Sequence, residues 1–305
     1  MCRPPLRQHQ HLWRLQHLYD AGADDDGPPG SPVLIAKPLF LAGLLSLAAV
    51  SAAGADLPPP QRIVSANLCT DRLVLALVGR DRVAAVSRFA ADPVASTVAA
   101  QAAGLAVTTG EVEDILARAP DLVVLGAYNA TTTAPMLRQL GIQVHVLAPG
   151  NGIAETLAAI RDLARDLGSE AAGEALVATI ETGLATQPHP EHRLKAAIYQ
   201  AGGWSAGRGT TADDLLRAVG MDNIAAEAGL VGFASLPLET LAAAGPDLIV
   251  VESMGEEAPS IAGEVLRHPA LAAGGARRVT VPMRLWACPD VALIEAAALI
   301  AGAGR

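Results

Sequence analysis

Charged and aromatic residues are both scarce in this chain of 305 residues, at 17% and 3% of the sequence. Acidic residues outnumber basic ones by 31 to 22, which gives a formal net charge of −9. This balance disfavours a nucleic-acid partner, because phosphate binding needs clustered Lys and Arg side chains. The H-E-x-x-H, C-x-x-C and P-loop patterns are also missing. The chain is 51% hydrophobic, which is enough to bury the core of one large or two medium domains.

The four histidines that follow residue 55 do not form a metal-binding pattern. His189 and His192 lie in the proline-rich stretch QPHPEHR, and His145 lies inside a predicted strand, where packing is the commoner role. His268 stands apart from the other three in the sequence. We therefore expect no metal site, no bound cofactor and no catalytic residues.

Residues 1–55 have the form of a leader. Lys37 precedes the apolar run Leu39–Val50, and the small residues Ala-Gly-Ala end at Ala55. A basic residue, an apolar run and a small-residue ending indicate a secretory signal peptide when they occur in this order. The residues upstream of Lys37 are interpreted as an over-called translation start or a disordered tail. We expect a mature chain that begins at about Asp56 and is exported to the periplasm.

Strand and helix patterns alternate along the expected mature chain. In residues 56–150, β-branched runs such as Arg62–Ala66 and Asp121–Gly126 alternate with helical spacing of apolar residues. A second series of the same kind occupies residues 191–305. Such alternation predicts parallel sheets covered by helices. The expected fold class is therefore α/β, with two Rossmann-like lobes.

Residues 151–190, between the two series, have no strand signal. Leu157, Ile160, Leu163 and Ala164 follow the i, i+3, i+4 spacing of an amphipathic helix. The segment predicts one long helix that joins the lobes and is kinked near Gly168. Two helices with a turn at this glycine are the alternative.

The few aromatic residues and several arginines cluster where predicted strands end or just before a helix. Ligands of open α/β sheets bind outside the carboxyl ends of the strands. Aromatic faces beside guanidinium groups suit a large, flat or polyanionic ligand. The sequence therefore predicts a cleft between the lobes. Its candidate ligand-binding residues are Arg88, Phe89, Tyr128, Trp204, Arg208, Phe233, Arg284 and Trp286.

Two cysteines remain after the leader, Cys69 and Cys288. Both are expected near the start of a helix that follows a strand, so both could face the cleft. An oxidising compartment favours a disulfide between them. A helix N-terminus lowers the pKa of a thiol, so a thiol that contacts the ligand is the alternative.

One layout of a helix followed by a strand occurs twice. In EVEDILARAPDLVVLG, Glu113 precedes Pro120 by seven residues, and in LETLAAAGPDLIVVE, Glu239 precedes Pro246 by the same offset. Each glutamate falls in the first turn of its predicted helix, where the helix dipole favours an exposed carboxylate. Stabilisation of a helix end is one explanation of the repeat, and a binding role for two equivalent carboxylates is the other.

The chain resembles the periplasmic substrate-binding proteins of ABC importers for vitamin B12 and ferric siderophores. The resemblance extends over about residues 62–301 and includes LRHPAL and LWACP near the C-terminus. It implies two α/β lobes bridged by a single long helix, a ligand between them, and no catalysis. The order and spacing of five further stretches carry it: RIVSANLCTDRLVLAL, VEDILARAPDLVVLG, LRQLGIQVHVL, GTTADDLLRAVGMDN and LETLAAAGPDLIVV.

The resemblance also implies roles for particular residues. Glu113 and Glu239 match the acidic residues with which the family docks onto arginine pockets of the two permease subunits, and Glu111 is a possible substitute for Glu113. Phe89 and Phe233 match positions where the family places aromatics against the ligand. Trp204, Arg208 and Trp286 fall in loops that form the cleft wall. The cysteines in NLCTD and WACPD depart from many relatives and bear on the identity of the ligand.

The expected function is therefore that of a monomeric binding protein that captures an iron chelate and delivers it to the permease dimer of an ABC importer. Three arginines in the cleft loops favour an anionic ferric siderophore. Cobalamin and haem are the alternatives within the family. An enzyme with two nucleotide-binding lobes is the less favoured alternative outside it, because such an enzyme would have no export signal.

Overall fold

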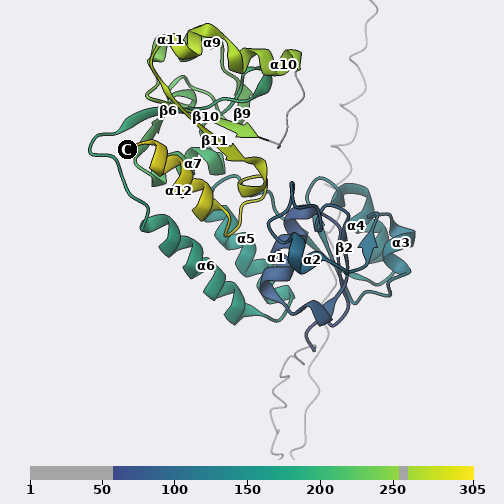
Figure 1. Cartoon of the computed structure of the whole chain (residues 1–305). Helices are drawn as coiled ribbons and strands as arrows, with labels where there is room; N and C mark the ends of the chain where they lie inside the picture. The colour runs from purple at the N-terminus through teal and green to yellow at the C-terminus, as the bar shows by residue number, and fades with distance from the viewer. Residues whose placement is uncertain (1–57, 254–259) are drawn as a thin grey trace, which may run out of the picture. The chain divides into compact units, whose positions relative to one another are not determined.

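Five parallel strands form the sheet of the first lobe (Figure 1). The computed structural model describes residues 58–253 and 260–305. The three residues of β1 and the first four of β4 are buried, as expected of central strands covered on both faces. The strand order is β3-β2-β1-β4-β5. The bounds are Ile63–Ser65 (β1), Val83–Ser87 (β2), Val107–Thr108 (β3), Leu122–Gly126 (β4) and Gln143–Leu147 (β5).

The helices of the first lobe follow its strands, as in other doubly wound sheets. The first of them begins directly after β1, where Asn67 caps it by accepting a hydrogen bond from the backbone N–H of Cys69 at 2.9 Å. This cap holds both residues at the carboxyl end of the sheet. The elements are α1 (Leu68–Leu77), the 3₁₀ helix η1 (Arg80–Arg82), α2 (Ala99–Ala102), α3 (Val112–Leu116) and α4 (Ala130–Gln139).

The second lobe contains a parallel sheet and a smaller antiparallel pair. The parallel strands have the order β11-β10-β6-β8, and β7 pairs with β9. The sequence patterns indicated β6, β10 and β11 but did not indicate β8 or the β7–β9 pair, which are only three residues long each. The bounds are Leu194–Ile198 (β6), Trp204–Ala206 (β7), Met221–Asn223 (β8), Phe233–Ser235 (β9), Leu248–Ser253 (β10) and Arg277–Pro282 (β11).

The helices of the second lobe include one whose first turn contacts the residues just before α5, since the Thr211 hydroxyl donates to the carbonyl of Gly150 at 2.9 Å. Helix α7 begins at Thr211 and is capped by Thr210, whose hydroxyl accepts from the Asp213 N–H at 3.1 Å. The elements are η2 (Ala201–Gly203), α7 (Thr211–Ala218), α8 (Ile224–Glu227), α9 (Leu238–Ala244), α10 (Ile261–Glu264), η3 (Val265–Arg267), α11 (Pro269–Ala273), η4 (Met283–Leu285) and α12 (Leu293–Ala303).

The prediction of one long connecting helix is wrong, and the alternative of two helices is what forms. Helix α5 spans Ile153–Asp166 and helix α6 spans Glu170–Ala185. Gly168 has a φ of +60°, and the N–H of Ser169 donates to the carbonyl of Ala164 at 2.8 Å. This is the Schellman arrangement that ends a helix at a left-handed glycine. The two helices pack as a hairpin (Figure 1), and α6 leads into the second lobe.

The hairpin packs closely because small residues meet next to its turn. A Cβ added at Gly173 of α6 would collide with the Cβ of Ala164 in α5. An ion pair joins the same helices, with Arg161 Nε 2.9 Å from Glu174 Oε1. The pair is largely exposed, so its contribution is small. Close backbone approach at the glycine therefore brings the two helices together next to the turn.

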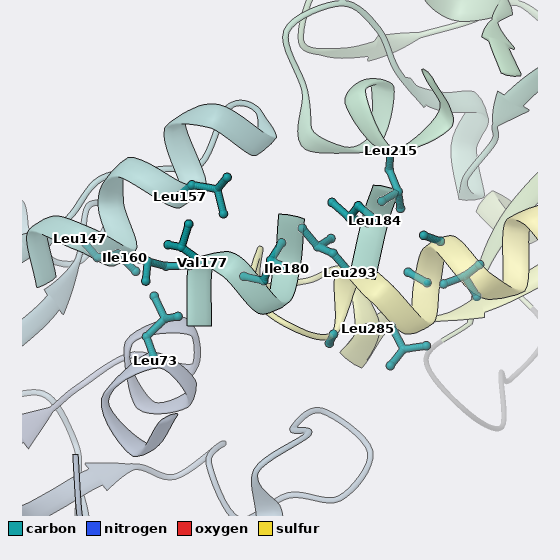
Figure 2. Packing of buried hydrophobic residues seen from close by; sticks show 14 of the residues in the cluster. Leu73, Leu147, Leu157, Ile160, Val177, Ile180, Leu184, Leu215, Leu285 and Leu293 are labelled. Atoms are coloured by element: carbon teal, nitrogen blue, oxygen red, sulfur yellow. The ribbon is translucent and has the colours of Figure 1, made fainter. Parts of the chain in front are cut away.

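One buried apolar cluster runs through both lobes. It includes residues of α1, α5, α6, α7 and α12 together with strands of both parallel sheets. In Figure 2, Val177 and Ile180 of α6 lie between Leu73 of α1 and Leu293 of α12, and the row of side chains continues past Leu293 to Leu215 and Leu285. Ile160 of α5 and Ile180 of α6, from the two helices of the hairpin, are fully buried. The lobes thus share a core along this side.

The leader predicted over residues 1–55 lies outside the described residues. Among the residues that the structure does describe, no helix has the length and apolar character needed to cross a membrane.

The close approach at Gly173 gives a stability prediction. Gly173→Leu should lower the free energy of unfolding by about 2 kcal/mol, because the added side chain overpacks the hairpin. The measurement is urea denaturation followed by circular dichroism. Gly302→Leu is the matched control, since Gly302 also lies in a helix but a Cβ there would meet nothing within 4 Å. Equal stability of the two variants would contradict the packing argument.

Candidate functional site

A pocket opens at the carboxyl ends of both parallel sheets. In the first sheet the chain order reverses at the pair β1 and β4, which makes this the point where a ligand is expected to bind. Asn67 follows β1 and Tyr128 follows β4, and both line the pocket. Cys69, the second residue of α1, lines it too.

The second lobe presents its own reversal point to the same pocket. Strands β6 and β10 are neighbours there, with β8 beyond one and β11 beyond the other. Gln200 follows β6 and Glu252 lies near the end of β10, and both line the pocket. The two reversal points thus face one cavity, which explains how residues distant in the sequence come together.

The pocket has a volume of about 640 Å³, which is within the range of about 300–1,000 Å³ usual for small-molecule sites. Most of its lining is apolar or carries only hydroxyl and amide groups, such as Thr156, Thr210 and Asn151. Among the described residues that line it, Glu252 is the only one with a charged side chain. The described wall therefore offers carboxylate, hydroxyl and amide groups but no cation.

The carboxylate of Glu252 is held by donors on both oxygens. Gln200 Nε2 donates to Oε2 at 2.9 Å, and Trp286 Nε1 donates to Oε1 at 3.1 Å. The three residues come from the end of β6, the end of β10 and the loop after η4. Hydrogen bonds to both oxygens fix the orientation of the carboxylate. Sequence reasoning missed Glu252 and Gln200, although each is a polar residue near the carboxyl end of a buried strand.

Three of the predicted aromatic residues line the pocket, and two do not. Tyr128, Phe233 and Trp286 are in the lining, whereas Phe89 and Trp204 are not. Tyr128 is 93% exposed and Phe233 is 57% exposed. Such exposure leaves wide aromatic faces available at the mouth of the pocket.

None of the three predicted arginines lies among the described lining residues. Arg88 lies over the ring of Phe89, with Cζ 4.6 Å from the ring centroid. Arg208 donates from Nη2 to the carbonyl of Ala226 at 3.0 Å. Arg284 sits in η4, and its backbone carbonyl accepts from another arginine. The side chains of Arg88 and Arg208 are thus engaged with protein groups outside the pocket wall.

A disulfide links the lobes at the edge of the pocket. Cys69 and Cys288 are bonded, with Cα atoms 5.1 Å apart and a sequence separation of 219. Of the two alternatives left open by the sequence, the structure has the bridge. Ala287 and Pro289 on either side of Cys288 line the pocket. The bridge therefore fixes one wall of the pocket against α1.

A buried ion pair lies beside the disulfide. Arg72 Nη2 is 2.6 Å from Asp290 Oδ1, and the two side chains are only 0% and 6% exposed. Arg72 Nη1 also donates to the carbonyl of Arg284 at 2.7 Å. Burial raises the pKa of Asp290, and the charge of Arg72 together with a hydrogen bond from the Ala292 N–H opposes that rise. Removing one partner of such a buried pair lowers the free energy of unfolding by about 3–5 kcal/mol. The pair therefore resists separation of the two lobes.

A second buried carboxylate organises the end of β2. Asp71 accepts hydrogen bonds from both the hydroxyl and the N–H of Ser87, at 2.5 and 3.1 Å. Burial raises the pKa of Asp71 to about 6, and the hydrogen bonds from serine side chains and from the Ser87 N–H act in the opposite direction. These contacts fix Ser87, the last residue of β2; Arg88 and Phe89, which directly follow it, are not among the residues that line the pocket.

The segment Gly203–Gly207 has the G-x-S-x-G spacing of hydrolase nucleophiles, but its structure does not suit that chemistry. Such a serine sits exposed on a sharp turn from a strand to a helix. Ser205 lies within β7, is fully buried, and donates its hydroxyl to the carbonyl of Ile198 at 2.5 Å.

In the described part of the chain, no group of three or more His, Cys, Asp or Glu residues could hold a metal ion.

The repeated glutamates occupy equivalent places in the two lobes. Glu113 lies in the first turn of α3 and Glu239 in the first turn of α9. Both are exposed. Within residues 58–253 and 260–305, neither carboxylate takes part in an ion pair. Glu111 is the N-cap residue of α3 and is exposed beside Glu113.

Comparison with known proteins gives consistent matches. A family model described as periplasmic binding protein matches residues 63–280. A cobalamin-binding protein of Halobacterium salinarum is 28% identical over 198 residues, which are 63% of this chain and 53% of that protein. The chain thus spans about half the length of this curated relative.

Solved structures match over four fifths of the chain. The periplasmic haem-binding protein RhuT from Roseiflexus, in its apo form, is 26% identical with a TM-score of 0.63, over 80% of this chain and 99% of that one. The periplasmic vitamin B12-binding protein BtuF of Vibrio cholerae is 16% identical with a TM-score of 0.58, over 81% and 97%. The second likeness concerns the fold alone. Both structures are of binding proteins with the same two-lobe α/β architecture.

The disulfide gives a prediction for stability. Replacing both Cys69 and Cys288 by Ser should lower the free energy of unfolding by about 2–5 kcal/mol, because the unfolded chain is no longer cross-linked. Urea denaturation of both proteins, with and without a reductant, measures this. Reductant should destabilise the natural chain and leave the double variant unchanged. Equal denaturation midpoints without reductant would contradict the prediction.

Proposed function

Because this chain belongs to the periplasmic binding protein family, we propose that it captures a corrinoid of the cobalamin type and delivers it to an ABC importer. The observation that carries the proposal is the pocket wall, which combines three aromatic side chains with hydroxyl and amide groups and no described cation. A corrin macrocycle is broad, and its peripheral side chains in cobalamin are uncharged carboxamides. Aromatic faces and neutral hydrogen-bonding groups suit both features. The cobalamin-binding relative supports the same ligand.

A ferric siderophore, the ligand favoured by the sequence, is less well supported. That expectation rested on three arginines in the cleft, and none of them lies in the described lining of the pocket. A polyanionic chelate buried beside Glu252 would meet a like charge, with no described cation in the lining to offset it.

Haem is the second candidate, and Tyr128 is the observation that favours it. Phenolate oxygen is a known ligand of haem iron, and Tyr128 is exposed at the mouth of the pocket. The propionates of haem would still lack a cationic partner in the described wall. This difference places haem behind a corrinoid.

The export and docking proposals follow from the leader and the repeated glutamates. We propose that residues 1–55 direct the chain to the periplasm, as their basic, apolar and small-residue order suggests. We propose further that Glu113 and Glu239 contact arginines of the two permease subunits. Exposed carboxylates without ion-pair partners in the described residues are well suited to bidentate pairing with arginine.

Ligand binding by the aromatic wall is tested with a pair of phenylalanines. Cyanocobalamin titrated into the mature chain should quench tryptophan fluorescence to saturation, and Phe233→Ala should weaken binding about tenfold through loss of stacking and buried area. Phe89→Ala is the control, because Phe89 lies outside the pocket lining. Haemin and a ferric hydroxamate are titrated in parallel. Saturable binding of either one, with none of cyanocobalamin, would replace the corrinoid proposal.

Docking is tested by charge reversal. The double variant Glu113→Arg, Glu239→Arg should abolish ligand uptake in cells that express the matching importer, while affinity for the ligand stays unchanged. Glu170→Arg is the control, because Glu170 is likewise an exposed glutamate in the first turn of a helix. This variant loses the same interaction with the helix dipole, worth about 0.3–1 kcal/mol. Undiminished uptake by the double variant would refute the docking role.

A further inference from the structure

Glu252 stands out in the pocket because it is an acid in a wall that is otherwise uncharged in the described residues. It lies near the end of β10, at the reversal point of the second sheet, where a ligand comes closest to the strand ends. A buried or half-buried acid is costly unless other groups satisfy it. Its presence at this place therefore needs a chemical explanation.

The groups around Glu252 fix its orientation. Gln200 Nε2 and Trp286 Nε1 each donate to one of its oxygens, at 2.9 and 3.1 Å. Both donors themselves line the pocket. An ionised carboxylate is an acceptor only. The two donors orient these oxygens at the pocket wall, so a ligand that enters meets a fixed acceptor.

A fixed carboxylate treats two kinds of ligand side chain in opposite ways. A carboxamide has two N–H donors and forms a charge-assisted hydrogen bond with it. A ligand carboxylate has no donor when ionised and is repelled, and the repulsion is stronger in a pocket of low dielectric than in water. Selectivity often arises from such a repulsive element as well as from attraction.

We propose that Glu252 is a specificity-determining residue that makes the pocket select macrocycles with carboxamide side chains over those with carboxylates. The inference rests on the proposed corrinoid ligand and specifies the chemical form that is captured. Amidated corrinoids are accepted, whereas the same ring with free acids is excluded. Gln200 and Trp286 act as positioning residues, since they orient the carboxylate.

The test compares two probes that share one ring. Dicyanocobinamide has carboxamides at the periphery, and dicyanocobyrinic acid has carboxylates at the same positions. The mature natural chain should bind the amide at least thirtyfold more tightly, as measured by fluorescence titration. Glu252→Gln should reduce this preference at least tenfold, mainly because the acid gains affinity. Raising the ionic strength should lower the ratio of the two affinities in the natural chain, because salt screens the repulsion of the acid probe. The ratio in Glu252→Gln should change little.

Two further variants separate charge in the pocket from general effects. Glu227→Gln removes one negative charge from an exposed position in α8 of the same lobe, outside the pocket lining, and should leave the preference unchanged. Glu252→Ala should also lose the discrimination, and the midpoint of thermal unfolding shows whether each variant is folded.

The outcomes distinguish this inference from the proposed function. If the natural chain binds the amide probe and Glu252→Gln keeps the full preference, the role of Glu252 is overturned while the corrinoid ligand stands. If the natural chain prefers the acid probe, the inference is likewise overturned. If it binds neither probe nor cyanocobalamin, the corrinoid proposal falls and the inference falls with it.

Discussion

The junction between the lobes is the constraint on which the rest of the structure depends. Arg72 of α1 and Asp290, just before α12, form an ion pair that water hardly reaches, and the disulfide between Cys69 and Cys288 lies beside it. The apolar cluster along α6 continues through the same junction. A buried ion pair is a weak source of net stability but is costly to break. These three contacts together resist any separation of the lobes.

A fixed junction leads to a pocket that is formed before the ligand arrives. The two reversal points of the sheets face each other across the cavity, and the loop around Cys288 closes one side of it. Walls that do not have to be assembled cost little conformational entropy on binding. Selectivity then depends on which groups the wall already presents, such as the oriented carboxylate of Glu252.

Much of the architecture was predictable from the sequence, whereas the direction of individual side chains was not. The strands β4 and β10 were evident because strands buried on both faces are almost continuously apolar. The turn at Gly168 was harder, because apolar spacing continues on both sides of it and packing of Gly173 against Ala164 determines the hairpin. Arg208 was correctly placed in a loop, but only the structure shows its hydrogen bond to the carbonyl of Ala226.

The disulfide has a consequence for how the chain can be made. Its two cysteines lie near the beginning and the end of the described residues, with a sequence separation of 219. Disulfides form in oxidising compartments and not in the reducing cytosol. In an exported chain, the second cysteine crosses the membrane only when translocation is almost complete. If this chain is exported as proposed, it would therefore cross the membrane without the cross-link, and the disulfide would form only after Cys288 has reached the oxidising compartment.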